Sequence, residues 1–247
     1  MALVVLLATL VGLSGCMDIT GRGAAPLEKT VDASRETRPL EGHVYCMRGW
    51  LGIFSTGMDD LASKLDKVVP SVSVADEEWY RLKGFLEEEH DAGHLKEPLI
   101  LVGHSWGADD QIRVAEDLGK HGITVDLLIT IDPVTPPSIP SNVKRCVNIY
   151  KSHPATDWFP FWRGVEVSRH AKDVPVTNID LRDAKLGFDT DAIDHINVEK
   201  NAGVHQLVLD EIRKVCPPRS AHATPNGIPV VTQAPKVTAP AVTASTP

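Results

Sequence analysis

One short segment of the chain combines a nucleophile with the backbone that a nucleophile needs. Residues 103–107 read Gly-His-Ser-Trp-Gly, directly after the apolar run 99–102 and directly before a helical stretch. In such a strand–turn–helix setting the serine lies on a tight turn and the glycines permit close backbone packing. The helix N-terminus presents N–H groups that stabilise an oxyanion. The pattern predicts nucleophilic catalysis by Ser105.

The elements that must position this serine alternate between apolar runs and amphipathic stretches. We expect strands at 43–48, 71–75, 98–102, 126–131, 145–150 and 174–180. We expect helices at 57–68, 76–91, 106–120 and 199–215, each with apolar residues along one face. Such alternation predicts an α/β domain with a mainly parallel sheet and helices on both faces.

A serine hydroxyl needs an adjacent base, and the base needs an acid that orients it. Asp132 follows the strand after the nucleophile strand, at the carboxyl edge where the sites of open parallel sheets gather. We therefore favour Asp132 as the acid. Asp157, in a longer loop one strand later, is the alternative.

The segment 103–107, the stretch Arg48-Gly49-Trp50 after an early strand, and the order serine, acid, histidine resemble the α/β-hydrolase family. The resemblance is to its small lipases, esterases and thioesterases, and it spans about residues 43–215. It implies the α/β-hydrolase fold and a reaction that needs no metal or cofactor. No insertion is long enough for a separate large cap domain.

The resemblance also implies a base and an oxyanion hole. The family places its histidine in the loop before the final helix, which matches His195. Its oxyanion donors are two backbone N–H groups, which match Trp106 and Trp50, with Leu51 as the alternative to Trp50. Arg48 stands where the family has a histidine, but the donors are backbone groups, so the chemistry is unaffected.

Other histidines are expected to have packing roles. His104, beside the nucleophile, should pack beneath the turn, and His205 lies inside the closing helix. Cys146 and Cys216 are the pair to test for a disulfide, whereas Cys46 lies mid-strand as a buried thiol. The cysteines and histidines do not have zinc-site spacing, so a structural metal site is not indicated.

Aromatic residues gather in the segment 153–164, which holds Trp158, Phe159, Phe161 and Trp162. An apolar wall of this kind suits an acyl chain. The same side chains could instead contact a membrane or a partner, or fold back onto the core.

The first fifteen residues read as a secretory signal, too short to span a bilayer. Leu13-Ser14-Gly15-Cys16 resembles a bacterial lipobox, although no Lys or Arg precedes the apolar run. The resemblance implies cleavage before Cys16 and attachment of lipid to it. We therefore expect an exported domain of the bacterial cell envelope, on the periplasmic side, tethered to the membrane by its lipid.

Composition bounds the rest of the chain. Of its 247 residues, 16–40 form the expected anchor and tether, 41–216 the domain, and 217–247 a disordered tail with seven prolines. The net charge of −8 and the lack of a basic run argue against a nucleic-acid partner. The oligomeric state is left open.

These observations together predict a membrane-tethered serine hydrolase that cleaves a carboxylic ester or a thioester through an acyl-enzyme. The alternative from another class is a non-catalytic envelope lipoprotein that uses the same fold as a binding module.

Overall fold

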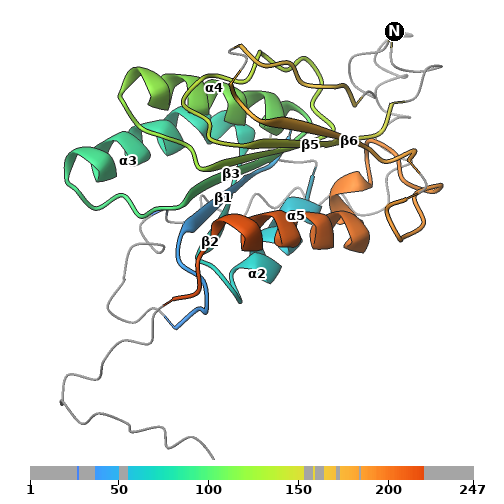
Figure 1. The fold of residues 1–247 in the computed structure, drawn as a ribbon, viewed down its shortest axis with the longest axis horizontal. Coiled ribbons are helices and arrows are strands. Elements are labelled where there is room, and N and C mark those ends of the chain that lie inside the picture. Colours follow the sequence, from blue (N-terminus) through green and yellow to red (C-terminus); the bar gives the residue numbers. More distant parts are fainter. Residues whose placement is uncertain are drawn as a thin grey trace, which may run out of the picture.

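The computed structural model describes residue 27 and residues 37–49, 55–152, 158, 164–170, 173–183 and 185–219. Six strands form one parallel sheet in the order β2-β1-β3-β4-β5-β6 (Figure 1). The strands are β1 (His43–Met47), β2 (Ser71–Val74), β3 (Leu99–His104), β4 (Leu127–Ile131), β5 (Cys146–Tyr150) and β6 (Val176–Asp180). The strand order reverses between β1 and β3, and such a switch point opens a crevice at the carboxyl ends of the strands.

Helices cover both faces of the sheet. They are α2 (Gly57–Leu65), α3 (Trp79–Asp91), α4 (Trp106–Lys120) and α5 (Ala202–Val215). Figure 1 shows α3 and α4 on one face and α2 and α5 on the other. The predicted fold class is therefore confirmed.

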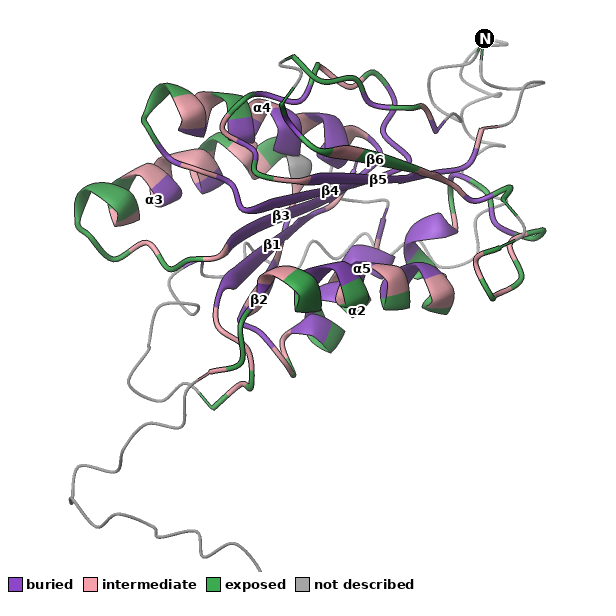
Figure 2. Ribbon diagram, viewed as in Figure 1, coloured by how far each residue is buried: buried purple, intermediate pink, exposed green. Residues whose placement is uncertain are grey.

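The alternation of side chains along each strand builds two apolar cores. On β3, Leu99 and Leu101 pack on the side of α3 and α4, and Ile100 and Val102 pack on the side of α2 and α5. The central strands are buried along their whole length (Figure 2). Each fully buried aliphatic side chain contributes about 1.5–3 kcal/mol to the stability of the folded chain. This burial fixes the positions of the strand ends.

Two predicted helices begin differently from the expectation. The first turn of the predicted helix 76–91 is the 3-10 helix η3 (Asp76–Glu78). The predicted helix 199–215 is interrupted, because η4 (Val198–Lys200) ends at Asn201, which has extended backbone. The Asn201 side chain accepts from the N–H groups of Gly203 and Val204, so it caps a separate helix, α5.

The cysteines correct one further expectation. Cys146 faces the core beneath α3 and α4, whereas Cys216 belongs to the core beneath α5. The sheet separates the two thiols, so they do not pair, and Cys46, Cys146 and Cys216 are all free and buried. Burial raises the pKa of Cys146 and of Cys216 to about 12 and the pKa of Cys46 well above its usual value.

Backbone and side-chain contacts of the folded domain extend slightly beyond residues 41–216. Leu40 and Pro218 form an antiparallel bridge, and the Arg219 guanidinium donates to the carbonyl oxygens of Arg38 and Leu40. None of the described helices combines the length and the apolar character needed to cross a bilayer. Cys16 lies outside the described residues.

Candidate active site

Ser105 lies at the turn between β3 and α4, at the carboxyl edge of the sheet. Its backbone has φ 57° and ψ −126°, a conformation that non-glycine residues rarely adopt and that costs about 1–3 kcal/mol. The Ser105 N–H donates to the Ile131 carbonyl oxygen at 2.9 Å, which ties the turn to the end of β4. The strained turn thus holds the hydroxyl at a fixed point above the sheet.

The two glycines of the segment are required by close backbone contacts. A Cβ atom at Gly103 would lie 2.4 Å from the carbonyl oxygen of Gly107. A Cβ atom at Gly107 would lie 2.1 Å from the carbonyl oxygen of Arg48. Both distances are far below van der Waals contact, so any side chain would push α4 away from β1 and β3.

Ser105, His195 and Asp132 form a continuous chain of hydrogen bonds. Ser105 Oγ lies 2.9 Å from His195 Nε2, and His195 Nδ1 lies 3.3 Å from Asp132 Oδ2. A carboxylate only accepts, so Nδ1 carries the proton and Nε2 is free to accept from the serine hydroxyl. Ser105 and His195 are each 7% exposed, and Asp132 is fully buried. This arrangement can activate a serine hydroxyl by general-base catalysis.

Backbone hydrogen bonds hold both the main chain and the carboxylate of Asp132. Asp132 follows β4 and has a positive φ of 47°. Its N–H donates to the Ile149 carbonyl oxygen at 2.8 Å, and its Oδ1 accepts from the Lys151 N–H at 2.7 Å. A Cβ atom at Gly164 would lie 2.0 Å from the same oxygen, so only glycine fits against the Asp132 carboxylate.

His104 supports the loop that carries His195. Its Nε2–H donates to the His195 carbonyl oxygen at 3.1 Å, and its Nδ1 accepts from the Ser55 hydroxyl at 2.6 Å. Ser55 Oγ in turn accepts from the Gly49 N–H at 3.2 Å. Burial, and then the neighbouring His195, hold the pKa of His104 well below its usual value, so its ring is neutral. His104 packs beneath the turn as expected, and it also makes a specific hydrogen bond to the His195 loop. The position of His104 directly before Ser105 was a signal for this contact.

Lys151 is a second residue that positions the same loop, and sequence reasoning missed it. Its buried ammonium donates to the carbonyl oxygens of Thr190, Asp191 and Ile193, at 2.6, 3.2 and 2.8 Å. Lys151 follows the carboxyl end of β5, as Asp132 follows β4, so its position in the sequence was an available signal.

Glu199 is a fully buried carboxyl group four residues after His195. Burial raises its pKa from the ordinary 4.5 to about 7, and Lys200 offsets part of the rise. Lys200 Nζ lies 3.8 Å from Glu199 Oε1. The sequence held no local signal for this burial. His205 has the packing role expected of it: its Nε2–H donates to the Glu199 carbonyl oxygen at 2.6 Å.

The backbone around the expected oxyanion hole is partly described. Trp106 is the first residue of α4, so its N–H lies at the positive end of the helix dipole, next to Ser105. Arg48 forms an ion pair with Asp59 of α2 that anchors the loop after β1. Trp50 and Leu51 lie outside the described residues.

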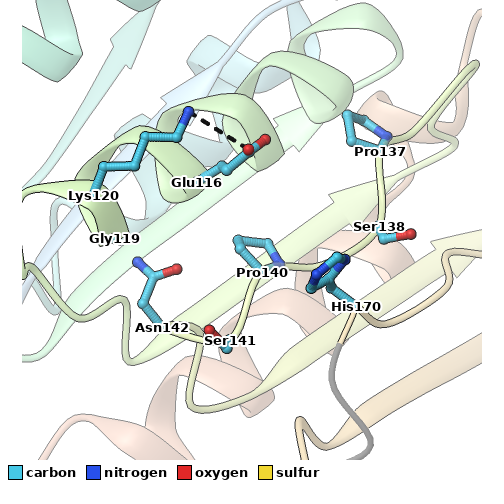
Figure 3. Close-up of a pocket in the computed structure, with 9 residues that line it drawn as sticks. All are labelled: Glu116, Gly119, Lys120, Pro137, Ser138, Pro140, Ser141, Asn142 and His170. Carbon is cyan, nitrogen blue, oxygen red and sulfur yellow. Dashed lines mark ion pairs between the residues drawn. The ribbon is translucent and has the colours of Figure 1, made fainter.

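The expected substrate wall is described only at Trp158, whose side chain is 78% exposed. Phe159, Phe161, Trp162 and the alternative acid Asp157 lie outside the described residues. A hollow of about 510 Å³ lies elsewhere, between the end of α4 and the loop before β5, and its lining contains no triad residue (Figure 3).

No protein-family model and no curated protein matches the sequence. Among solved structures, the chain is similar to the thioesterase domain SrfTE of surfactin cyclisation, at 12% identity and a TM-score of 0.47, covering 70% of this chain and 91% of that one. The NocB thioesterase domain of the nocardicin cluster matches at 13% identity and a TM-score of 0.44, covering 70% and 93%.

An esterase from the archaeon Pyrobaculum calidifontis matches at 20% identity and a TM-score of 0.31, covering 40% of this chain and 38% of the esterase. The identities and TM-scores are low in all three cases, so residue roles do not transfer from these proteins.

Proposed function

We propose that this chain is a serine hydrolase that cleaves a carboxylic ester or a thioester through an acyl-enzyme. The observation that carries the proposal is the hydrogen-bond chain from Ser105 Oγ through His195 to Asp132. Its support by His104 and Lys151 adds to the case, because catalytic side chains must be held in place by their neighbours.

The reaction follows from this geometry in two halves. Ser105 Oγ attacks the acyl carbon while His195 Nε2 takes the hydroxyl proton, and Asp132 stabilises the resulting imidazolium. The N–H groups of Trp106 and Trp50 stabilise the oxyanion. His195 then passes the proton to the leaving alcohol or thiol. Water, activated by the same imidazole, releases the carboxylic acid and restores the serine.

Hydrolysis of matched substrates tests this proposal. The purified chain should release p-nitrophenol from short acyl esters and thiol from the thioesters of the same acyl groups. Ser105→Ala should abolish both reactions while the circular dichroism spectrum stays unchanged. A folded wild-type chain that hydrolyses neither substrate would favour the alternative, a binding module built on the same fold.

Two further parts of the proposal rest on the sequence: an aromatic wall for the acyl chain and a lipid anchor for the membrane. We propose that Trp158, Phe159, Phe161 and Trp162 form a wall for the acyl group. Lipid on Cys16 anchors the enzyme to the bacterial cell envelope, on the periplasmic side. Mass spectrometry of the mature N-terminus tests the anchor, because an unmodified Met1 or another cleavage site would contradict it.

A further inference from the structure

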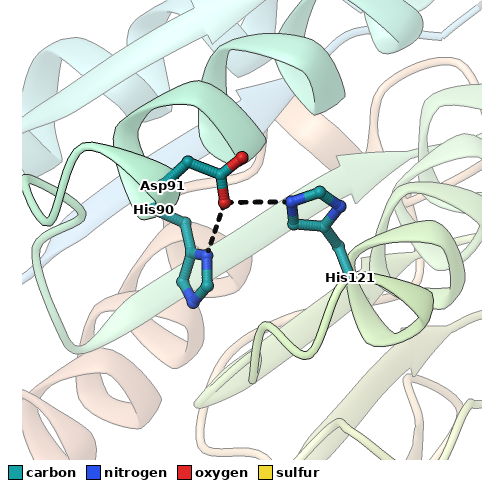
Figure 4. A group of neighbouring side chains, drawn as sticks. All are labelled: His90, Asp91 and His121. Atoms are coloured by element: carbon teal, nitrogen blue, oxygen red, sulfur yellow. Dashed lines mark hydrogen bonds and ion pairs between the residues drawn. The ribbon is translucent and has the colours of Figure 1, made fainter.

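His90, Asp91 and His121 form a cluster of side chains that can ligate a metal, at the ends of two neighbouring helices (Figure 4). His90 and Asp91 are the last two residues of α3, and His121 follows the last residue of α4. His121 Nε2 lies 3.1 Å from Asp91 Oδ1, and His90 Nδ1 lies 3.3 Å from the same oxygen. One carboxylate thus joins imidazoles from two helices.

The separations within the cluster match two edges of a tetrahedral zinc site. With zinc–ligand bonds of about 2.0–2.1 Å, neighbouring ligand atoms lie about 3.3 Å apart. Both contacts of Asp91 have close to this length, and the three ligand atoms all lie within 4.8 Å of one another. Both contacts are hydrogen bonds, so zinc binding requires each imidazole proton to move to the other ring nitrogen. The side chains of His90 and His121 are 42% and 39% exposed, so rotation of the two imidazoles can close the third edge.

The local electrostatics favour a cation. The Asp91 carboxylate accepts from both imidazoles and supplies negative charge at the centre of the cluster. The carboxyl ends of α3 and α4 contribute negative partial charge at the same place. The nearby Lys120 ammonium is paired with Asp117 at 2.8 Å and Glu116 at 3.5 Å, which offsets its repulsion of a cation.

The cluster lies at the edge of the sheet where strands begin. The chain passes from α3 into β3 and from α4 into β4 at this edge, whereas Ser105 and Asp132 follow the carboxyl ends of those strands. The six residues of β3 span about 20 Å at roughly 3.3 Å per residue. A metal in the cluster is therefore remote from the triad.

We propose that His90, Asp91 and His121 bind a zinc ion that links α3 to α4, with water at the fourth position. Two imidazoles and one carboxylate suit zinc, whereas Ca²⁺ and Mg²⁺ prefer oxygen ligands. The ion stabilises the folded chain because the unfolded chain does not hold the two helix ends together. It takes no part in hydrolysis, so this proposal stands or falls independently of the proposed function.

Zinc binding to the untagged full-length chain tests the proposal. We expect one Zn²⁺ per chain by equilibrium dialysis and no binding of Ca²⁺ under the same conditions. At a zinc concentration about 100-fold above Kd, the Tm should rise by about 5–10 °C.

Single substitutions locate the site. Asp91→Asn and His121→Ala should each raise the Kd for Zn²⁺ at least about tenfold and abolish the zinc-dependent rise in Tm. His170→Ala, at an exposed histidine outside the cluster, should bind zinc like the wild type. All of these positions are exposed, so the variants should fold. No zinc binding by the wild type, or unchanged affinity in both Asp91→Asn and His121→Ala, would overturn the proposal.

Discussion

The backbone N–H of Lys151 donates to Asp132 Oδ1 across 2.7 Å, from the end of the neighbouring strand. This bond occupies one carboxylate oxygen and leaves Oδ2 for His195 Nδ1, 3.3 Å away. The position of the Asp132 carboxylate is therefore set by the register of β4 and β5, in which Ile131 lies opposite Ile149. A carboxylate fixed in this way can select the tautomer of His195 without a contribution from Asp157.

Asp132→Asn should lower kcat by at least about a hundredfold, judged against the roughly 10⁴-fold loss for the equivalent change in a serine protease. The amide that replaces the carboxylate favours the wrong tautomer of His195. Asp157→Asn should cost less than about tenfold, because Asp132 already supplies the carboxylate that contacts His195 Nδ1. The measurement is kcat on a short p-nitrophenyl ester. A nearly unchanged kcat in Asp132→Asn together with a strongly reduced kcat in Asp157→Asn would place the acid one strand later.

Lys151→Met should lower kcat by up to about a hundredfold, because displacement of a catalytic group by about 1 Å can cost that much. The substitution leaves three carbonyl oxygens of the His195 loop without their ammonium donor. The KM should change little, since the Lys151 ammonium contacts the loop that carries His195. Lys144→Met is the matched control, because Lys144 is an exposed lysine paired with Asp126. Equal activities of the two variants would refute the positioning role of Lys151.

His104→Asn should lower kcat by about tenfold or more, because the shorter amide loses the bond to the His195 carbonyl oxygen. His104→Gln should recover part of the loss, since its amide nitrogen can reach the position of Nε2. Melting temperatures of both variants separate positioning from simple destabilisation. A higher kcat in His104→Asn than in His104→Gln would show that the hydrogen bond to His195 does not matter for catalysis.

The pKa of Glu199 makes stability depend on pH. Because this pKa is raised from 4.5 to about 7, the unfolded chain loses the proton first as the pH rises. Stability should therefore fall between pH 4.5 and pH 7. Glu199→Gln cannot ionise, so it should equal the wild type at pH 4 and exceed it by up to about 3 kcal/mol at pH 8. Urea unfolding at both pH values checks this, and equal stabilities at pH 8 would show that the folded chain ionises Glu199 normally.

The turn that carries Ser105 could be predicted from the sequence because its signals are local. A continuous apolar run specifies a buried strand, and two glycines flank the serine where the backbone must pack closely. Asp132 could be named because the residue after a parallel strand lies at the carboxyl edge. Both predictions depend only on residues that are adjacent in the sequence.

The positions of Lys151 and His104 at strand ends were available signals, but their partners could not be predicted because they lie in distant segments. Lys151 reaches Ile193 and His104 reaches His195, and neither pair leaves a periodic pattern in the sequence. The wrong cysteine pair, in contrast, could have been avoided from the sequence. Side chains alternate along β5, and Cys146 lies on the face opposite to the one that α5 and Cys216 cover.

Covalent labelling of Ser105 tests the central claim most directly. The purified chain should react with a fluorophosphonate, gain the mass of one phosphonyl group, and carry it on the peptide that contains Ser105. Ser105→Ala should remain folded by circular dichroism and stay unlabelled, and His195→Ala should label far more slowly than His205→Ala. A folded wild-type chain that does not label, or a label retained in Ser105→Ala, would contradict the account.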